Sequence, residues 1–129
     1  MQDDARSRVL KRCALAFVFL WFAIGGVAHF VTPDFFLKIV PPNLPLRMAA
    51  VHVSGFFELL GAAALLHRAL RRAAGIGLFL LVIVVTPANV YMWQHAHLFP
   101  AIPQTLLALR LVLQVILLAL IWWSTQADA

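Results

Sequence analysis

Four apolar stretches divide this chain, and their length limits the fold more strictly than any other feature of the sequence. They cover residues 13–31, 48–66, 73–93 and 101–123. Each has about the 20 residues that an α-helix needs to cross roughly 30 Å of hydrocarbon at about 1.5 Å per residue. The sequence therefore predicts an all-α fold, an integral membrane four-helix bundle, with residues 1–129 as a single transmembrane domain.

The overall composition supports a membrane protein. Hydrophobic residues make up 64% of the chain and charged residues only 12%, whereas about a quarter of an ordinary soluble domain is charged. So few polar side chains cannot cover a water-soluble domain, and we expect the surplus apolar surface to contact the lipid bilayer. Of the ten Lys and Arg residues, seven stand in two short stretches beside apolar runs. That placement is typical of membrane topology rather than of a nucleic-acid-binding face, so no nucleic-acid partner is expected.

The basic residues also predict the orientation in the membrane. Seven lie before the first stretch or between the second and third, and two lie on the opposite side of the bundle. The seven are Arg6, Arg8, Lys11, Arg12, Arg68, Arg71 and Arg72, and the two are Lys38 and Arg47. By the positive-inside rule we expect a multi-pass protein of the inner (cytoplasmic) membrane with both termini in the cytoplasm. A secretory signal is the alternative interpretation of the N-terminus, but the first apolar run exceeds the usual signal core of roughly 7–15 residues.

The connection between the first and second stretches is rich in proline and aromatic residues. Residues 33–45 contain four prolines, which prevent a long helix there. The same segment contains Phe35, Phe36 and several aliphatic residues, which are too apolar for free solution. We therefore expect an outer loop that either lies along the membrane surface as a stiff connector or folds over the bundle as a lid above a cavity.

Polar side chains inside the stretches concentrate in one half of the predicted bundle. An Arg or Asp at mid-helix costs roughly 2.5–3.5 kcal/mol on insertion scales, so each such group needs a partner. Counted at about 1.5 Å per residue from the helix ends, these groups fall in the outer half, and the inner half is nearly all apolar. The residues predicted to form a polar pocket there are Glu58, Arg110, His29, His52, Asn89 and Gln114.

Helical spacing links these groups in pairs. Ser54 and Glu58 stand four residues apart, as do Arg110 and Gln114, so each pair occupies one helix face. Glu58 and Arg110 fall at similar depth, and we predict an ion pair between them that joins the second and fourth helices. This pair serves either as a structural link or as part of a polar pocket that opens outward. Pro87 predicts a kink in the third helix, which either helps to form the pocket or is a packing detail.

The sequence contains no recognisable reaction machinery. The single cysteine, Cys13, rules out an intrachain disulfide, a thiol pair and a thiolate zinc site. His95 and His97 are two residues apart, and such a pair converges on one metal ion only in an extended segment. Without a further fixed carboxylate we expect no metal site. The catalytic residues of any enzymatic activity stay unknown.

Short motifs follow one another along nearly the whole chain. They are Gly26 to Phe30 (GVAHF), Pro33 to Pro45, Ser54-Gly55 with Glu58-Leu59 and Gly61, Arg72 to Ala74, Pro87 to Met92 (PANVYM), and Leu109-Arg110 with Gln114. In order and spacing they resemble the DoxX-like family of small bacterial membrane proteins with four helices. Relatives in that family include a membrane subunit of a quinone-linked oxidoreductase and proteins proposed to act in redox complexes. A more distant animal relative assists receptor assembly.

The resemblance implies a bacterial inner membrane protein but no catalytic motif. The positions that match the family's pattern are His29, Glu58, Asn89, Arg110 and Gln114. These are five of the six residues that depth alone assigns to the pocket, so the two lines of reasoning agree on one region of the bundle.

Three functions fit these observations. The first is a binding or accessory protein that holds a lipid-like or quinone-like molecule, or a membrane or periplasmic protein partner, in the outer pocket. The second is a membrane subunit of a quinone-linked oxidoreductase, with Glu58 and His29 handling protons. The third is a ligand-free assembly or chaperone-like factor. We favour the first, because the sequence offers one candidate pocket and no reaction machinery. An oligomer is compatible with all three.

Overall fold

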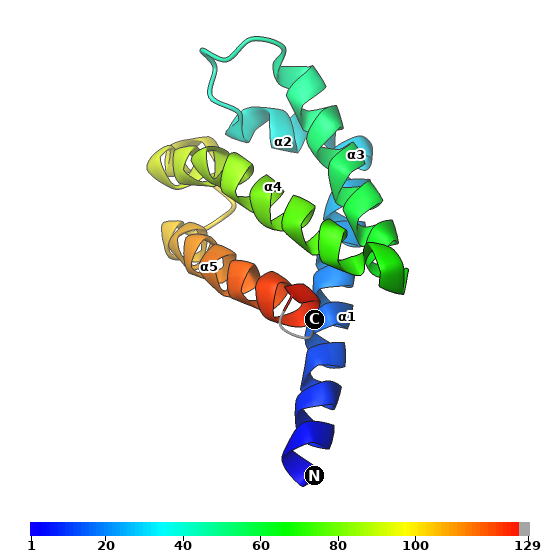
Figure 1. Cartoon of the computed structure of the whole chain (residues 1–129). Coiled ribbons are helices and arrows are strands. Elements are labelled where there is room, and N and C mark those ends of the chain that lie inside the picture. The colour runs from blue at the N-terminus through cyan, green and yellow to red at the C-terminus, as the bar shows by residue number, and fades with distance from the viewer. Residues whose placement is uncertain (127–129) are drawn as a thin grey trace.

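The computed structural model describes residues 1–126, and every regular element in that range is helical (Figure 1). Four of these helices are long and apolar enough to cross a membrane, and they correspond to the four predicted stretches. They are α1 (Gln2–Val31), α3 (Arg47–Leu65), α4 (Arg68–Gln94) and α5 (Gln104–Gln126). The connections contain the short helix α2 (Pro33–Ile39) and the 3₁₀ turn η1 (Ala96–Leu98). The all-α prediction is confirmed, while residues 127–129 of the predicted domain lie outside the described residues.

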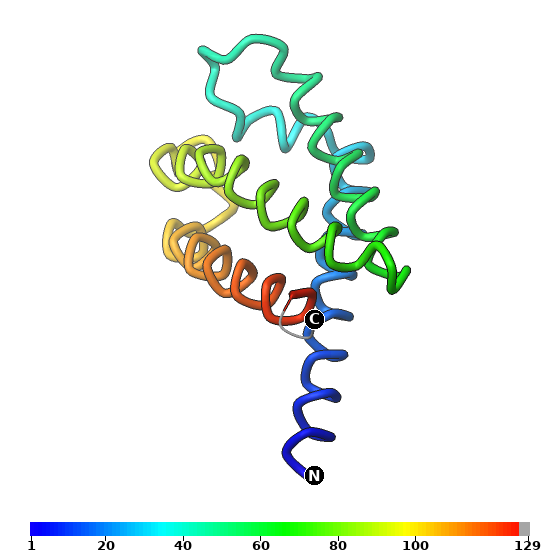
Figure 2. Tube along the Cα trace, in the orientation of Figure 1, coloured from blue at the N-terminus to red at the C-terminus, as the bar shows by residue number. Residues whose placement is uncertain are grey.

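Helices α1 and α4 begin earlier than the apolar pattern indicates. Helix α1 starts at Gln2 rather than at residue 13, and α4 starts at Arg68 rather than at residue 73. Because Arg and Lys are good helix formers, a helix extends into charged sequence, whereas hydropathy marks only its apolar part. At about 1.5 Å per residue α1 is about 45 Å long. Its N-terminal turns project past the end of α5 (Figures 1 and 2).

The four long helices form a ring of neighbours. Helix α1 packs on α3, α3 on α4, α4 on α5, and α5 on α1, so α3 and α5 stand diagonally opposite each other. An apolar core fills the half of the bundle nearest the start of α4 and the end of α5. Its buried residues are Val18, Phe22, Ala62, Leu65, Ala74, Leu78, Val82, Leu117 and Ile121. Of the buried polar residues, Asn89 and Gln114 lie in the other half of the bundle, whereas Thr125 and Gln126 lie beyond this core at the end of α5.

Large apolar side chains also cover the outside of the bundle. Leu20, Phe56 and Val115, from three different helices, are 53%, 56% and 67% exposed. Many other large apolar side chains on the four long helices are also exposed, which is unusual for a soluble monomer. The outer faces of the helices are therefore suited to contact with lipid.

The proline-rich connection contains a short helix followed by an irregular segment. Pro33 stands in the first turn of α2, where its fixed φ favours a helix and its missing N–H leaves no bond unmade. Arg47, the first residue of α3, donates hydrogen bonds through Nη2 to the carbonyl oxygens of Leu37 at 2.7 Å and Val40 at 2.8 Å. These bonds reach two carbonyl groups at the end of α2, where the carbonyl oxygen of Leu37 also accepts the backbone N–H of Val40 at 3.3 Å. They also hold α2 against the start of α3.

Candidate functional site

A cavity of about 520 Å³ lies in the half of the bundle nearest α2. Helices α1, α2, α3, α4 and α5 and the segment after α2 all contribute to its wall, which is mostly apolar. The apolar lining includes Trp21, Ile24, Phe36, Ile39, Val40, Val51, Val84 and Val85, and the polar lining is His29, Ser54, Glu58, Asn89 and Arg110. Its volume and the few converging polar groups are typical of sites for small organic molecules.

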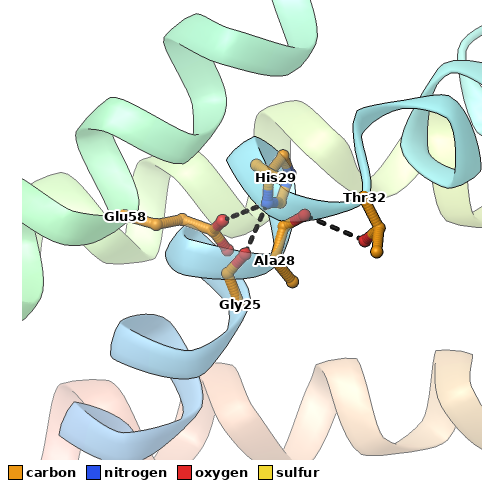
Figure 3. Close-up of polar contacts among 5 residues, drawn as sticks. All are labelled: Gly25, Ala28, His29, Thr32 and Glu58. Carbon is orange, nitrogen blue, oxygen red and sulfur yellow. Dashed lines mark hydrogen bonds and ion pairs between the residues drawn. The ribbon is translucent and has the colours of Figure 1, made fainter.

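His29 and Glu58 meet at the wall between α1 and α3. Nδ1 of His29 lies 2.9 Å from Oε2 of Glu58 and 2.7 Å from the carbonyl oxygen of Gly25 (Figure 3). The carbonyl oxygen of Gly25 can only accept a hydrogen bond, so Nδ1 carries a hydrogen in this arrangement. Helices α1 and α3 run in opposite directions (Figure 1), and helical side chains lean toward the N-terminus of their own helix. The imidazole and the carboxylate therefore lean toward each other.

Close packing of α1 on α3 brings this pair within reach. A Cβ atom on Gly55 would lie 2.6 Å from Cβ of His29, and one on Gly26 would lie 2.7 Å from Cγ of Leu59. Both separations are too short for any residue larger than glycine without movement of the helices. Small residues at these positions let the two backbones approach, as in many membrane helix pairs.

Gln114 organises a second polar cluster between α4 and α5. Its Oε1 accepts hydrogen bonds from Nδ2 of Asn89 at 2.9 Å and from Nη1 of Arg110 at 2.8 Å. Its Nε2 donates to the carbonyl oxygen of Val82 at 3.0 Å and to Oγ1 of Thr86 at 2.9 Å. An amide side chain can donate two hydrogen bonds and accept two, so the buried Gln114 is fully satisfied. It fixes the positions of Asn89 and Arg110 at the edge of the cavity.

Arg110 also lies over the indole ring of Trp21. The guanidinium carbon is 4.9 Å from the ring centroid, a geometry that favours a cation–π interaction. The ion pair predicted between Arg110 and Glu58 is not formed: Arg110 bonds to Gln114, and the carboxylate of Glu58 lies against His29. The prediction was wrong because equal depth does not make two helices neighbours. Helices α3 and α5 are diagonal in the bundle, so the two charges face the same cavity from opposite walls.

The structure brings four of the six predicted pocket residues to the cavity wall: His29, Glu58, Asn89 and Arg110. Gln114 lies directly behind that wall. His52 does not line the cavity; it is exposed, and its ring stacks on Phe30 with centroids 5.5 Å apart. The reason is rotation about the helix axis, because six residues at about 100° each turn His52 roughly 240° from Glu58.

Sequence reasoning missed two aromatic residues of the site. Trp21 lies on the same face of α1 as His29, two turns earlier, and that spacing is the signal that could have found it. Phe36 stacks on the His29 ring with centroids 3.8 Å apart and planes inclined by 18°. Its position follows from the short helix α2, which the proline count did not predict.

The histidine pair after α4 takes part in aromatic packing. His95 stacks on Tyr91 with ring centroids 4.0 Å apart, and the His95 and His97 rings are 5.9 Å apart. Within residues 1–126, no group of three His, Cys, Asp or Glu side chains is arranged to hold a metal ion.

Comparison with known proteins identifies the family to which the chain belongs. A protein-family model described as a domain of unknown function (DUF8561) matches residues 17–125. The chain belongs to the DUF8561 family. The DUF8561 segment contains every residue that lines the cavity, from Trp21 on α1 to Arg110 on α5. No curated protein and no solved structure matches the chain.

Proposed function

We propose that the protein crosses a membrane four times and binds a lipid-like or quinone-like molecule in the cavity beside α2. The observation that carries this proposal is the cavity itself, about 520 Å³ in volume and lined by apolar residues around a few polar groups. A bundle packed solid between Glu58, Asn89 and Arg110 would instead favour a ligand-free assembly factor.

The polar groups on the cavity wall are suited to a small polar head. Nδ1 of His29 and Nδ2 of Asn89 are already bonded inside the wall. Nε2 of His29 and Oδ1 of Asn89 form no hydrogen bond with any residue in the range 1–126, and both side chains line the cavity. Arg110 adds a positive charge on the wall across from Glu58. A ligand with a carbonyl, hydroxyl or carboxylate head would find donors and acceptors here, and its apolar part would contact Ile24, Val84 and their neighbours.

Helix α2 and the segment after it support the lid interpretation of the proline-rich connection. Phe36, Ile39 and Leu44 line the cavity, so this connection does more than join α1 to α3. Arg47 holds α2 in place through two backbone carbonyls. Entry of a ligand between this lid and the bundle, directly from the lipid, is part of the proposal.

The proposed membrane is the bacterial inner membrane, with both termini in the cytoplasm. Four long apolar helices and their exposed aliphatic faces support insertion. The basic residues at the start of α1 and of α4 support the orientation by the positive-inside rule. The cavity then lies in the outer half of the bilayer. Membership of the wider DoxX-like group is likewise a proposal, which rests on the motifs quoted above.

A quinone-linked oxidoreductase subunit is the second candidate, and the His29–Glu58 contact favours it. The imidazole bonds to an acceptor through Nδ1 and lines the cavity, so it can pass a proton between Glu58 and a bound molecule. Electrons for quinone reduction would have to come from a partner protein.

Binding is tested by thermal stability with two probes, a short-tailed ubiquinone analogue and oleic acid. We expect one probe to raise the melting temperature of the purified protein, since a ligand at 100 times its Kd stabilises by about 2.7 kcal/mol. Ser54→Phe fills the cavity and should abolish the shift. Its matched control is Val53→Phe, because Val53 is the preceding residue on α3 and is 52% exposed. Equal shifts in the two variants, or no shift with either probe in the unmodified protein, would contradict the proposal.

A further inference from the structure

A second hollow lies at the opposite end of the bundle from the cavity. It is formed where α1 passes the start of α4 and the end of α5, and its volume is about 530 Å³. Its basic lining residues are Arg8, Lys11, Arg12, Arg68, Arg71 and Arg72. Two hydroxyl groups from α5, those of Ser124 and Thr125, complete the polar part of the wall, and no acidic side chain of the described chain lines it. We call this feature the basic hollow.

The five arginines around the basic hollow form no ion pair with a carboxylate of residues 1–126. The acidic residues within 1–126 are Asp3, Asp4, Asp34 and Glu58. None of them forms an ion pair with the five lining arginines in the described range. The positive-inside rule explains why basic residues share one side of a membrane. It does not require segments far apart in the sequence to surround one hollow, where like charges repel. An anion at this place would remove that repulsion.

Two of the arginines are held in position through their Nε atoms. Arg72 donates from Nε to Oε1 of Gln126 at 3.2 Å, and Nε2 of Gln126 donates back to the carbonyl oxygen of Arg72 at 2.6 Å. Arg71 donates from Nε to the carbonyl oxygen of Leu65 at 2.9 Å. Each guanidinium thus keeps its two terminal nitrogens for another acceptor. A pair of parallel N–H groups matches two oxygens of a phosphate.

The wall of the basic hollow is built by close contact between α4 and α5. A Cβ atom on Gly75 would overlap the side chain of Thr125. The absence of that atom lets the last turn of α5 rest against the first turns of α4, where Gln126 meets Arg72. The contact between α4 and α5 therefore helps to hold Arg72 in position through Gln126.

We propose that the basic hollow binds a phosphate group, and that its source is the headgroup of an anionic phospholipid. The proposal rests on the membrane insertion given under the proposed function, but not on the cavity beside α2. Leu15, the most apolar part of the lining, lies where the charged turns of α1 give way to its apolar stretch. In a spanning helix that boundary falls at the level of the lipid headgroups. Basic recesses between membrane helices suit such headgroups.

Native mass spectrometry of the full chain in detergent tests this proposal, with phosphatidylglycerol and phosphatidylcholine as probes. We expect preferential retention of phosphatidylglycerol. Arg68→Gln should weaken its binding by about fivefold, which corresponds to about 1 kcal/mol for one basic residue near the headgroups. Arg6→Gln is the matched control, because it also removes one positive charge at this end of the bundle, from α1, but Arg6 does not line the hollow. Arg12→Gln is a second test variant, since no described side chain depends on it for a hydrogen bond.

The outcomes separate the alternatives. Equal retention of the two lipids, or equal losses in Arg68→Gln and Arg6→Gln, would overturn the proposal. If inorganic phosphate displaces phosphatidylglycerol at equal concentration, the site recognises free phosphate and the lipid source is overturned. Ser54→Phe should bind phosphatidylglycerol as the unmodified protein does. A failure of the cavity proposal would therefore leave this result unchanged, and the reverse also holds.

Discussion

Replacement of His29 by leucine should destabilise the protein by about 3 kcal/mol. The substitution removes the group that lies 2.9 Å from Oε2 of Glu58 and leaves a largely buried carboxylate without its neighbour. Removal of one partner from a buried pair costs about 3–5 kcal/mol. We expect the lower end of that range, because Glu58 borders the cavity and is not fully enclosed. Thermal unfolding in detergent measures the effect.

Two further variants separate the pair from a general loss of packing. His29→Leu combined with Glu58→Gln should recover most of the lost stability, because the neutral amide no longer needs a charged or donating partner. His52→Leu is the matched control, since His52 is exposed and stacks only on Phe30. It should change stability by less than about 1 kcal/mol, as surface substitutions usually do. Similar melting temperatures for the His29→Leu and His52→Leu proteins would show that the contact between His29 and Glu58 does not stabilise the protein.

Gln114→Leu should have the next largest effect and lower the free energy of unfolding by about 2–3 kcal/mol. Gln114 makes four hydrogen bonds, to Asn89, Arg110, Val82 and Thr86. Hydrogen bonds between membrane helices average about 0.6 kcal/mol each, and the substitution also leaves Nη1 of Arg110 without its acceptor. The free energy of unfolding in mixed micelles of detergent and lipid is the quantity to measure.

A double-mutant cycle tests whether these bonds act together. Asn89→Ala should cost less in the Gln114→Leu background than alone, with a coupling of about 0.6 kcal/mol for their shared bond. Gln94→Leu serves as the control, because it makes the same change at an exposed residue at the end of α4. If Gln114→Leu were no worse than Gln94→Leu, the cluster would not stabilise the bundle.

The four long helices could be predicted because hydrocarbon thickness imposes one length on every crossing. Helix ends could not, since Arg68, Arg71 and Arg72 are charged and yet belong to α4. Hydropathy reports which residues suit lipid, and helix formation depends on backbone hydrogen bonds and on propensity. The short helix α2 was missed for a related reason. Four prolines argue against a long helix, but Pro33 at the first turn favours a short one.

The polar region of the bundle could be predicted, but its pairs could not. Depth along the helix axis placed His29, Glu58, Asn89 and Arg110 in one region, and all four line the cavity. Pairing depends also on rotation about each axis and on which helices are neighbours. Rotation turned His52 outward, and the ring order of the helices separated Glu58 from Arg110. Neither quantity can be obtained from residue spacing within a single helix.

The central claim is that the cavity beside α2 holds an amphipathic molecule in the membrane. It is tested most directly by organic extraction and quantitative mass spectrometry of purified protein. We predict about one equivalent of a single lipid-like or quinone-like species with the unmodified protein and with Val53→Phe, and a large loss of that species with Ser54→Phe. The same extracted lipids in the same amounts from all three proteins would contradict the claim.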